Sequence, residues 1–172
     1  MMDAPNPAKP PRVLDFDMVA PEKLRDNKAL VEWVLPMVTK ACEHSYGRFE
    51  PLGVIRSCAG LNPHWKAQLW VIGYRGGGQP PTIEAVAVTC INTFETGRKV
   101  LDVVLVGGQG AKDWIVIQEP IAQWAAHNGC DEMQTIGRRG WERTLGEQWS
   151  EQARVFIRPL APLKGDGHGE GV

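Results

Sequence analysis

Two long apolar segments joined by a short polar turn constrain the fold of this chain most. Residues Ile83–Phe94 (IEAVAVTCINTF) and Val100–Val106 (VLDVVLV) are rich in β-branched residues, and Glu95 to Gly97 lie between them. This pattern predicts an antiparallel β-hairpin. Because Val100–Val106 is apolar almost without interruption, we expect burial on both faces and a central position in the sheet.

Helical and strand-like patterns alternate on both sides of this hairpin. The expected elements are a strand Val13–Val19, a helix Pro21–Ser45 kinked or divided at Pro36, a helix Glu50–Leu61, a strand Ala67–Tyr74 with a loose connection over Gly76–Pro81, a helix Lys112–His127 kinked at Pro120 and stopped by Gly129, a strand Met133–Ile136, a helix Arg139–Leu145 and a strand Arg154–Leu160. The strand–helix–strand order late in the chain predicts parallel pairing. We therefore expect a mixed, mostly antiparallel α/β sheet with helices on both faces.

The two ends of the chain differ in composition from its middle. Residues 1–12 are rich in proline and residues 162–172 in glycine, so we expect flexible arms around a domain spanning residues 13–161. Such arms are typical of segments that become ordered on partner proteins.

Charge and cysteine spacing exclude several classes of function. The 19 basic and 20 acidic residues give a net charge of −1, so no general field attracts nucleic acid or an anionic membrane. The four cysteines form no CxxC pair, which favours buried thiols in a reducing compartment and no metal site. With neither an apolar signal core near residue 1 nor a membrane-length apolar stretch, we expect a cytoplasmic protein.

Three segments carry a resemblance to a known superfamily. They are the hairpin itself, the glycine loop GGQGAKDW before a helix, and the stretch AAHNGCDEMQTIGRRGWERTL. Together they resemble the GNAT acetyltransferases, and the pairing of a "GG…W" loop with a "GR.GW…L" ending resembles small GNAT-like proteins encoded by bacteriophages. The resemblance implies that acetyl-CoA enters a gap beside the strand that precedes the glycine loop.

The same resemblance implies a place for the pyrophosphate of acetyl-CoA. Backbone amides at a helix start attract phosphate, and glycines allow close approach. The matching residues are Gly107, Gly108, Gln109, Gly110 and Ala111, with Lys112 adding charge. The superfamily pattern Arg/Gln-x-x-Gly-x-Gly/Ala is shortened here, and the alternative is that these glycines only turn the chain from a strand into a helix.

The catalytic groups implied by the resemblance are only partly present. Glu84 and Asp102 interrupt apolar runs and are the candidates for a general base, although an acidic residue at a strand edge is more often only solvated. The tyrosine that commonly acts as the acid is missing, since Tyr46 and Tyr74 lie elsewhere and Trp141 stands near its place. Arg138, Arg139 and Arg143 could receive phosphate or form a solvated helix face.

Two functions remain open at this point. The narrowly favoured one is a phage-encoded, virion-associated or structural protein with degenerate acetyltransferase features, made in the host cytoplasm and held in an assembly by its arms. The missing tyrosine, the shortened loop, the arms and the seven tryptophans support it. The alternative is an active acetyl-CoA-dependent N-acetyltransferase acting on an unidentified amine.

Overall fold

The chain folds into one five-stranded sheet with helices on both faces. The structure is a computed structural model, and it describes residues 12–45, 47–109, 111–137 and 142–152. Its elements are β1 (Arg12–Val19), α1 (Pro21–Asp26), α2 (Lys28–Glu43), α3 (Pro51–Cys58), β2 (Gln68–Gly76), β3 (Gln79–Thr93), β4 (Lys99–Gly108), α4 (Ala111–His127), β5 (Glu132–Thr135) and α5 (Glu142–Leu145). The predicted strand Arg154–Leu160 and most of both predicted arms lie outside the described residues, while Arg12 belongs to β1.

The order of the strands in the sheet follows their order in the chain. β1, β2, β3 and β4 pair antiparallel in turn, and β5 pairs parallel with β4 because α4 carries the chain back across the sheet. The predicted hairpin and the mixed, mostly antiparallel sheet are thus confirmed. β4 lies between β3 and β5, in agreement with its continuous apolar run.

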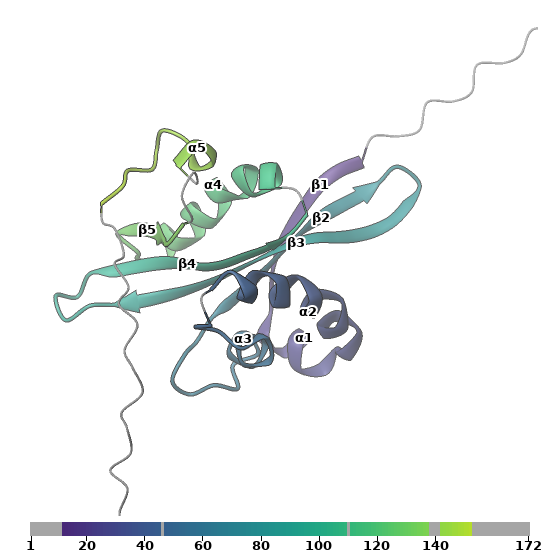
Figure 1. The fold of residues 1–172 in the computed structure, drawn as a ribbon, viewed down its shortest axis with the longest axis horizontal. Helices are drawn as coiled ribbons and strands as arrows, with labels where there is room; N and C mark the ends of the chain where they lie inside the picture. Colours follow the sequence, from purple (N-terminus) through teal and green to yellow (C-terminus); the bar gives the residue numbers. More distant parts are fainter. Residues whose placement is uncertain (1–11, 46, 110, 138–141, 153–172) are drawn as a thin grey trace, which may run out of the picture.

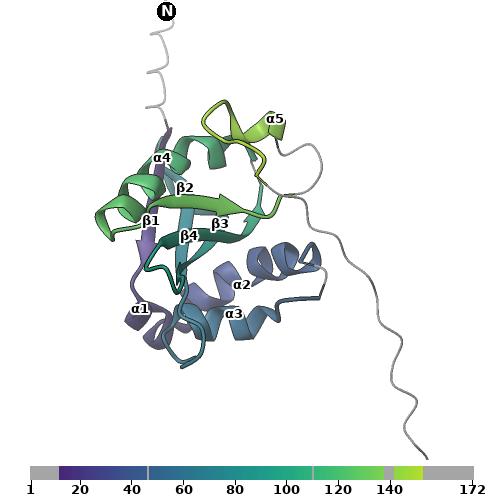
Figure 2. The same cartoon turned by 90° about the vertical axis from the view of Figure 1, so that its left-hand side faces the viewer.

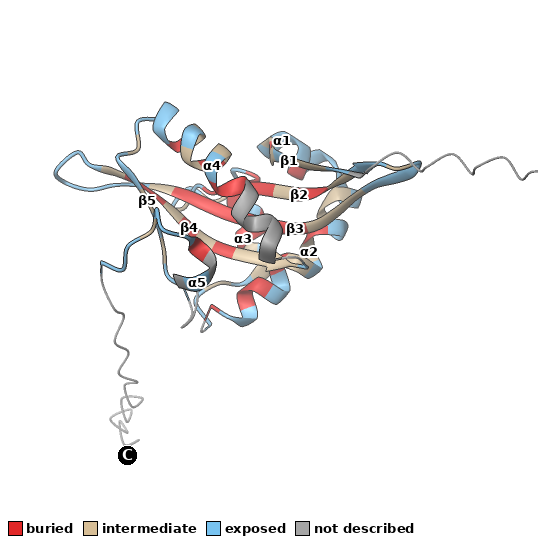
Figure 3. Ribbon diagram, turned by 90° about the horizontal axis from the view of Figure 1, so that it is seen from above, coloured by how far each residue is buried: buried red, intermediate tan, exposed pale blue. Residues whose placement is uncertain are grey.

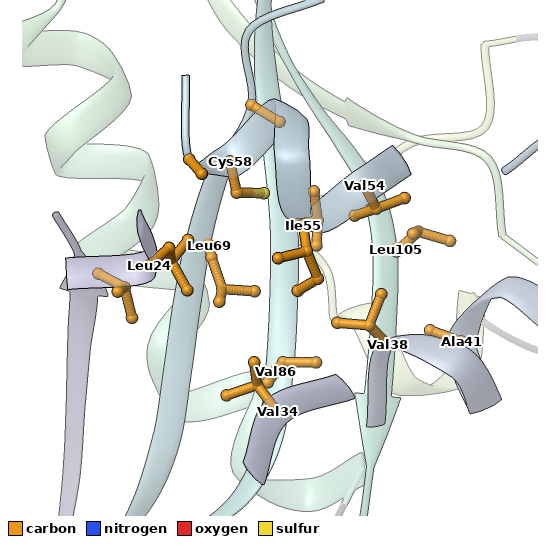
Figure 4. Close-up of a cluster of buried hydrophobic side chains, with 14 of the residues drawn as sticks. Leu24, Val34, Val38, Ala41, Val54, Ile55, Cys58, Leu69, Val86 and Leu105 are labelled. Carbon is orange, nitrogen blue, oxygen red and sulfur yellow. The ribbon is translucent and has the colours of Figure 1, made fainter. Parts of the chain in front are cut away.

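The helices divide into two groups (Figure 1). α1, α2 and α3 cover one face of the sheet, and α4 and α5 lie on the other, as the turned view in Figure 2 also shows. Each face has its own buried cluster. The α2–α3 face gathers side chains from α1, α2, α3 and four strands, with Val34, Val38, Ile55, Leu69, Val86 and Leu105 among them (Figure 4).

The α4 face is packed by the other side of the same strands. Its cluster includes Ile72, Leu101 and Val103 from the sheet and Ile117 and Ile121 from α4. The middle segments of the strands are accordingly the most buried part of the molecule (Figure 3). Burial on both faces explains why these strands read as nearly continuous apolar runs.

The first predicted helix is divided, but not at its proline. α1 ends before Asn27, whose side-chain oxygen accepts a hydrogen bond from the backbone N–H of Leu30 at 3.0 Å and caps α2. Pro36 lies inside α2. Of the two predicted alternatives at Pro36, a kink or a break, the break was wrong, because α2 runs through Pro36 and tolerates the one missing backbone N–H. The division lies at Asn27 instead, where the side-chain cap satisfies a free amide of the new helix.

The connection between β2 and β3 is tighter than predicted. Gly76 pairs directly with Gln79, so Gly76–Pro81 is a hairpin end rather than a loose linker. Pro80 falls where the pairing register shifts between Tyr74 and Gly76. An irregular register tolerates a residue that cannot donate to the ladder.

The end of α4 was predicted correctly. Gly129 has a φ of +77°, the N–H of Gly129 donates to Ala126 O, and the N–H of Cys130 donates to Ala125 O. This pair of hydrogen bonds is the Schellman motif, which favours glycine at that position. It turns the chain sharply into β5.

Candidate functional site

The strands β4 and β5 separate half-way along β4. Their pairing runs from Val100 opposite Glu132 to Val103 opposite Thr135, and the Thr135 hydroxyl donates to Val103 O at 2.9 Å. Beyond it, residues 104–108 of β4 have no partner strand on that side within the described chain. Peptide groups on such an open edge can pair with the amides of an extended ligand.

A β-bulge lies at the point of separation. Thr89 pairs with Val103 and Val88 with Leu105, so Val104 is the extra residue of β4. A bulge bends its strand and increases the local twist, and bulges are common beside active sites. The bend contributes to the divergence of β4 from β5.

A cleft of about 220 Å³ lies beside this separation. One side is formed by the strands, and the other by the C-terminal end of α2 with the residues that follow it. The lining residues are Ala41, His44, Ser45, Arg48 and Phe49 on the helix side and Asp102, Val103, Val104, Leu105, Val106, Gln134, Thr135 and Ile136 on the strand side.

Asp102 is the carboxylate of this cleft. It is partly buried, pairs across the sheet with Gln134, and accepts a hydrogen bond from the Asn92 side chain. Burial raises the pKa of the Asp102 carboxyl above its ordinary value, and hydrogen bonds from Gln134 and Asn92 oppose part of that rise. A carboxylate with a raised pKa is a stronger base toward a bound ammonium group.

Glu84, the other predicted base, lies elsewhere on the sheet. Asp102 is opposite Cys90, and Glu84 is six residues away from Cys90 along β3, which corresponds to about 20 Å of strand. The Glu84 carboxylate accepts a hydrogen bond from the Thr82 hydroxyl at 3.3 Å. Glu84 does not line the cleft, so the structure does not bring the two predicted carboxylates together.

The predicted phosphate loop begins inside the sheet. Gly107 and Gly108 belong to β4, and the N–H of Gln109 donates to Glu84 O at 2.8 Å. That amide is therefore already bound. Gly110 lies outside the described residues, and Ala111 begins α4, with Lys112 next to it.

The two glycines of β4 have packing roles of their own. A Cβ on Gly107 would lie 2.3 Å from Met37 O, so the absence of a side chain lets α2 approach the sheet. Gly108 has a φ of +117°, and a Cβ there would lie 2.3 Å from Glu84 O. These contacts favour the alternative that Gly107 and Gly108 shape the end of the strand. The pyrophosphate site over Gly107–Lys112 stays a prediction.

Other sequence-predicted groups take no part in the described cleft. Arg143 is exposed, Tyr74 lies on β2, and Arg138, Arg139, Tyr46 and Trp141 lie outside the described residues. The four cysteines are free thiols, three of them buried, and burial raises the pKa of Cys58 to about 12. Within residues the structure describes, no group of His, Cys, Asp or Glu side chains is arranged to hold a metal ion.

The helix side of the cleft was not predicted from the sequence. His44, Arg48 and Phe49 follow a helix that was recognised only by its apolar face, and nothing in their spacing marks a site. A signal existed in Glu50-Pro51, a helix cap followed by proline, which places these residues in the connection between α2 and α3.

Comparison with solved structures identifies the fold. An aminoglycoside acetyltransferase from an uncultured soil metagenomic sample has a TM-score of 0.56 at 10% identity, covering 86% of this chain and 97% of that one. A ribosomal-protein-alanine N-acetyltransferase from Brucella melitensis biovar Abortus 2308 has a TM-score of 0.56 at 13% identity, covering 87% and 100%. A predicted acetyltransferase with acetyl-CoA from Clostridium acetobutylicum has a TM-score of 0.54 at 9% identity, covering 84% and 96%.

The chain has the GNAT acetyltransferase fold. Its similarity to these structures extends over nearly their whole length, at identities that establish the fold alone. No protein-family model and no curated protein sequence matches the chain. In the described part, no helix is both long and apolar enough to cross a membrane.

Proposed function

We propose that this protein is an acetyl-CoA-dependent N-acetyltransferase that acts on an amine. The observation that carries the proposal is the separation of β4 from β5 at Val103, directly beside a cleft that contains Asp102. The fold it shares with acetyltransferases, one of them solved with acetyl-CoA, supports the same reaction class.

The open half of β4 is suited to hold the coenzyme. The pantetheine arm of acetyl-CoA is extended and contains two amides, which can bond to peptide groups of residues 104–108 as a further strand would. The start of α4 then offers amides and the positive end of its dipole to the pyrophosphate.

Asp102 is suited to act on the amine. An amine must lose a proton when its nitrogen bonds to the thioester carbonyl carbon, and the bond from that carbon to sulfur breaks. The Asp102 carboxylate lies in the cleft beside the separation and can take this proton directly or through water. The departing thiolate takes up a proton in the same step or from solvent.

The other function predicted from the sequence is that of a virion-associated or structural protein with degenerate acetyltransferase features. It rests on the missing tyrosine, the shortened glycine loop, the two arms and the seven tryptophans. Gly110, Trp141 and the arms apart from Arg12 lie outside the described residues. The solved structures named above are described as acetyltransferases, so acetyl transfer is the better supported conclusion.

Calorimetric titration with acetyl-CoA, followed by turnover assays on a panel of amines, tests the proposal. We expect Asp102→Asn to lower kcat by about 10²–10⁴-fold and to leave the Kd of acetyl-CoA unchanged. Glu84→Gln is the matched variant of the other carboxylate, and its kcat should stay close to that of the unmodified protein. Absence of acetyl-CoA binding, or a larger loss of kcat in Glu84→Gln, would contradict the proposal.

A further inference from the structure

The cleft carries opposite charges on its two sides. Asp102 lies on the strand side, and Arg48 lies on the helix side together with His44. Most of the other lining residues are apolar, with Ala41 and Val104 among them. A ligand that fills the cleft therefore meets an anionic and a cationic group across an apolar stretch.

The charge of Arg48 is not neutralised within the described chain. Arg75 and Arg98 have carboxylate partners, Asp15 and Glu132, whereas no ion pair of Arg48 is found among the described residues. The nearby Glu50 carboxylate caps α3 by accepting hydrogen bonds from the backbone N–H groups of Leu52 and Gly53 at 3.0 and 2.5 Å, and no ion pair between it and Arg48 is found among the described residues. The guanidinium is thus available to a ligand anion.

The position of Arg48 is held by its neighbours. Its backbone N–H donates to Ser45 O at 3.2 Å. The next residue, Phe49, stacks on Trp65 with ring centroids 5.3 Å apart and an interplanar angle of 25°. These contacts hold the backbone from which the exposed Arg48 side chain extends.

The size of the cleft limits the acceptor. About 220 Å³ is below the roughly 300–1,000 Å³ of pockets that take drug-sized molecules. The strand side of the cleft includes Val104 to Val106, along which the pantetheine arm is proposed to lie, so the acceptor has only part of this volume. A small amine meets that limit, with its ammonium group toward Asp102.

We infer, building on the proposed function, that the acceptor carries an anionic group a few atoms from its amine, as an amino acid does. Asp102 receives the amine, and Arg48 receives the carboxylate or phosphate at the other side of the cleft. Arg48 is therefore a specificity-determining residue for the acceptor and has no part in holding acetyl-CoA.

Steady-state kinetics on the full chain tests this inference with a matched pair of acceptors, leucine and leucinamide, which differ in the carboxylate. We expect the unmodified protein to prefer leucine. Arg48→Gln should raise the KM for leucine about 10–100-fold, as expected for loss of a charge-assisted pair, while the KM for leucinamide and the Kd of acetyl-CoA stay the same. Arg56→Gln, an exposed arginine of α3 outside the cleft, is the control and should change none of these values.

A charge-reversed variant sharpens the test. Arg48→Glu should shift the preference from leucine toward a diamine. Equal KM changes for both acceptors, a weaker Kd for acetyl-CoA in Arg48→Gln, or acetyl-CoA binding without turnover of either acceptor would overturn the inference and leave the coenzyme site standing. Absence of acetyl-CoA binding would instead overturn the proposed function.

Discussion

The two halves of β4 are both rich in apolar residues, but their surroundings differ. The closed half, residues 99–103, is bonded to β3 on one side and, from Val100 on, to β5 on the other. Leu101 within it is fully buried. In the open half, residues 104–108, all residues but the bulge residue Val104 pair with β3, and Val104 to Val106 line the cleft. Within the described chain, the end of a neighbouring strand, rather than a change in polarity, separates a segment paired on both sides from one with an unpaired edge.

Contacts at the start of the parallel pairing hold the closed half together. The N–H of Asp131 donates to Lys99 O at 2.8 Å, and the N–H of Lys99 donates to the Asp131 carboxylate at 2.9 Å. This exchange fixes the register before β5 begins. β5 then ends after four residues, which leaves the other half of β4 open.

Truncation of a core residue in the closed half should have the largest effect. Leu101→Ala removes a fully buried side chain from the α4 face and should lower the free energy of unfolding by about 2–5 kcal/mol. Val104→Ala, in the open half and only partly buried, should cost about 1 kcal/mol. Urea denaturation measures both, and an equal cost would show that the two halves are equally packed.

A side chain at Gly107 should disturb the open half almost as strongly. Gly107→Val would force Met37 O away from a contact of 2.3 Å, so we expect a loss of unfolding free energy at or above about 3 kcal/mol, and a displaced α2. Gly97→Ala, at the hairpin end with φ +82° and no atom within 4 Å of the new Cβ, should cost about 1–2 kcal/mol. Thermal denaturation of the two variants would contradict this assignment if Gly97→Ala were the less stable.

Asp102 lies near the boundary between the two halves of β4. Its carboxyl should make the free energy of unfolding depend on pH. Its pKa is raised in the folded protein, so the folded state keeps the proton at pH values where the unfolded state has lost it. Stability should therefore fall as pH rises from the ordinary aspartate value through the raised one, and Asp102→Asn should flatten the profile in that window. The effect should be smaller than that of the core variants because the side chain is only partly buried. A profile that is unchanged in the variant would assign the pH dependence to other groups.

Loss of the ion pair at the closed end should have the smallest effect. Arg98 Nη2 lies 2.5 Å from Glu132 Oε2, and both side chains are about half exposed. Arg98→Ala should cost less than about 1 kcal/mol, and the difference should shrink as salt is added. Denaturation at low and high ionic strength measures it, and a cost that is large and insensitive to salt would mean that this pair, rather than the backbone exchange at Lys99, holds β5 in place.

Part of the site was predictable and part was not. Glu84 and Asp102 carry the same signal, a carboxylate that interrupts an apolar strand, and the sequence offers no means to separate them. Their positions along the sheet separate them, since six residues of strand span about 20 Å. Arg48 carried no signal, because its relation to Asp102 depends on how α2 packs on β4.

Local patterns were sufficient for most elements and for the main strand pairings, although not for the division of α1 from α2 at Asn27 or for the tight connection between β2 and β3. The hairpin, the parallel pairing and the end of α4 could be predicted because they depend on residues close together in the sequence. These are the runs of β-branched residues, the short turn before Val100 and the glycine after α4. The division of β4 into a closed and an open half depends on where β5 ends, on the bulge at Val104 and on the close approach of α2 at Gly107. These are contacts between segments far apart in the chain, and only folding brings them together, which is why the cleft and the charges across it emerged from the tertiary structure.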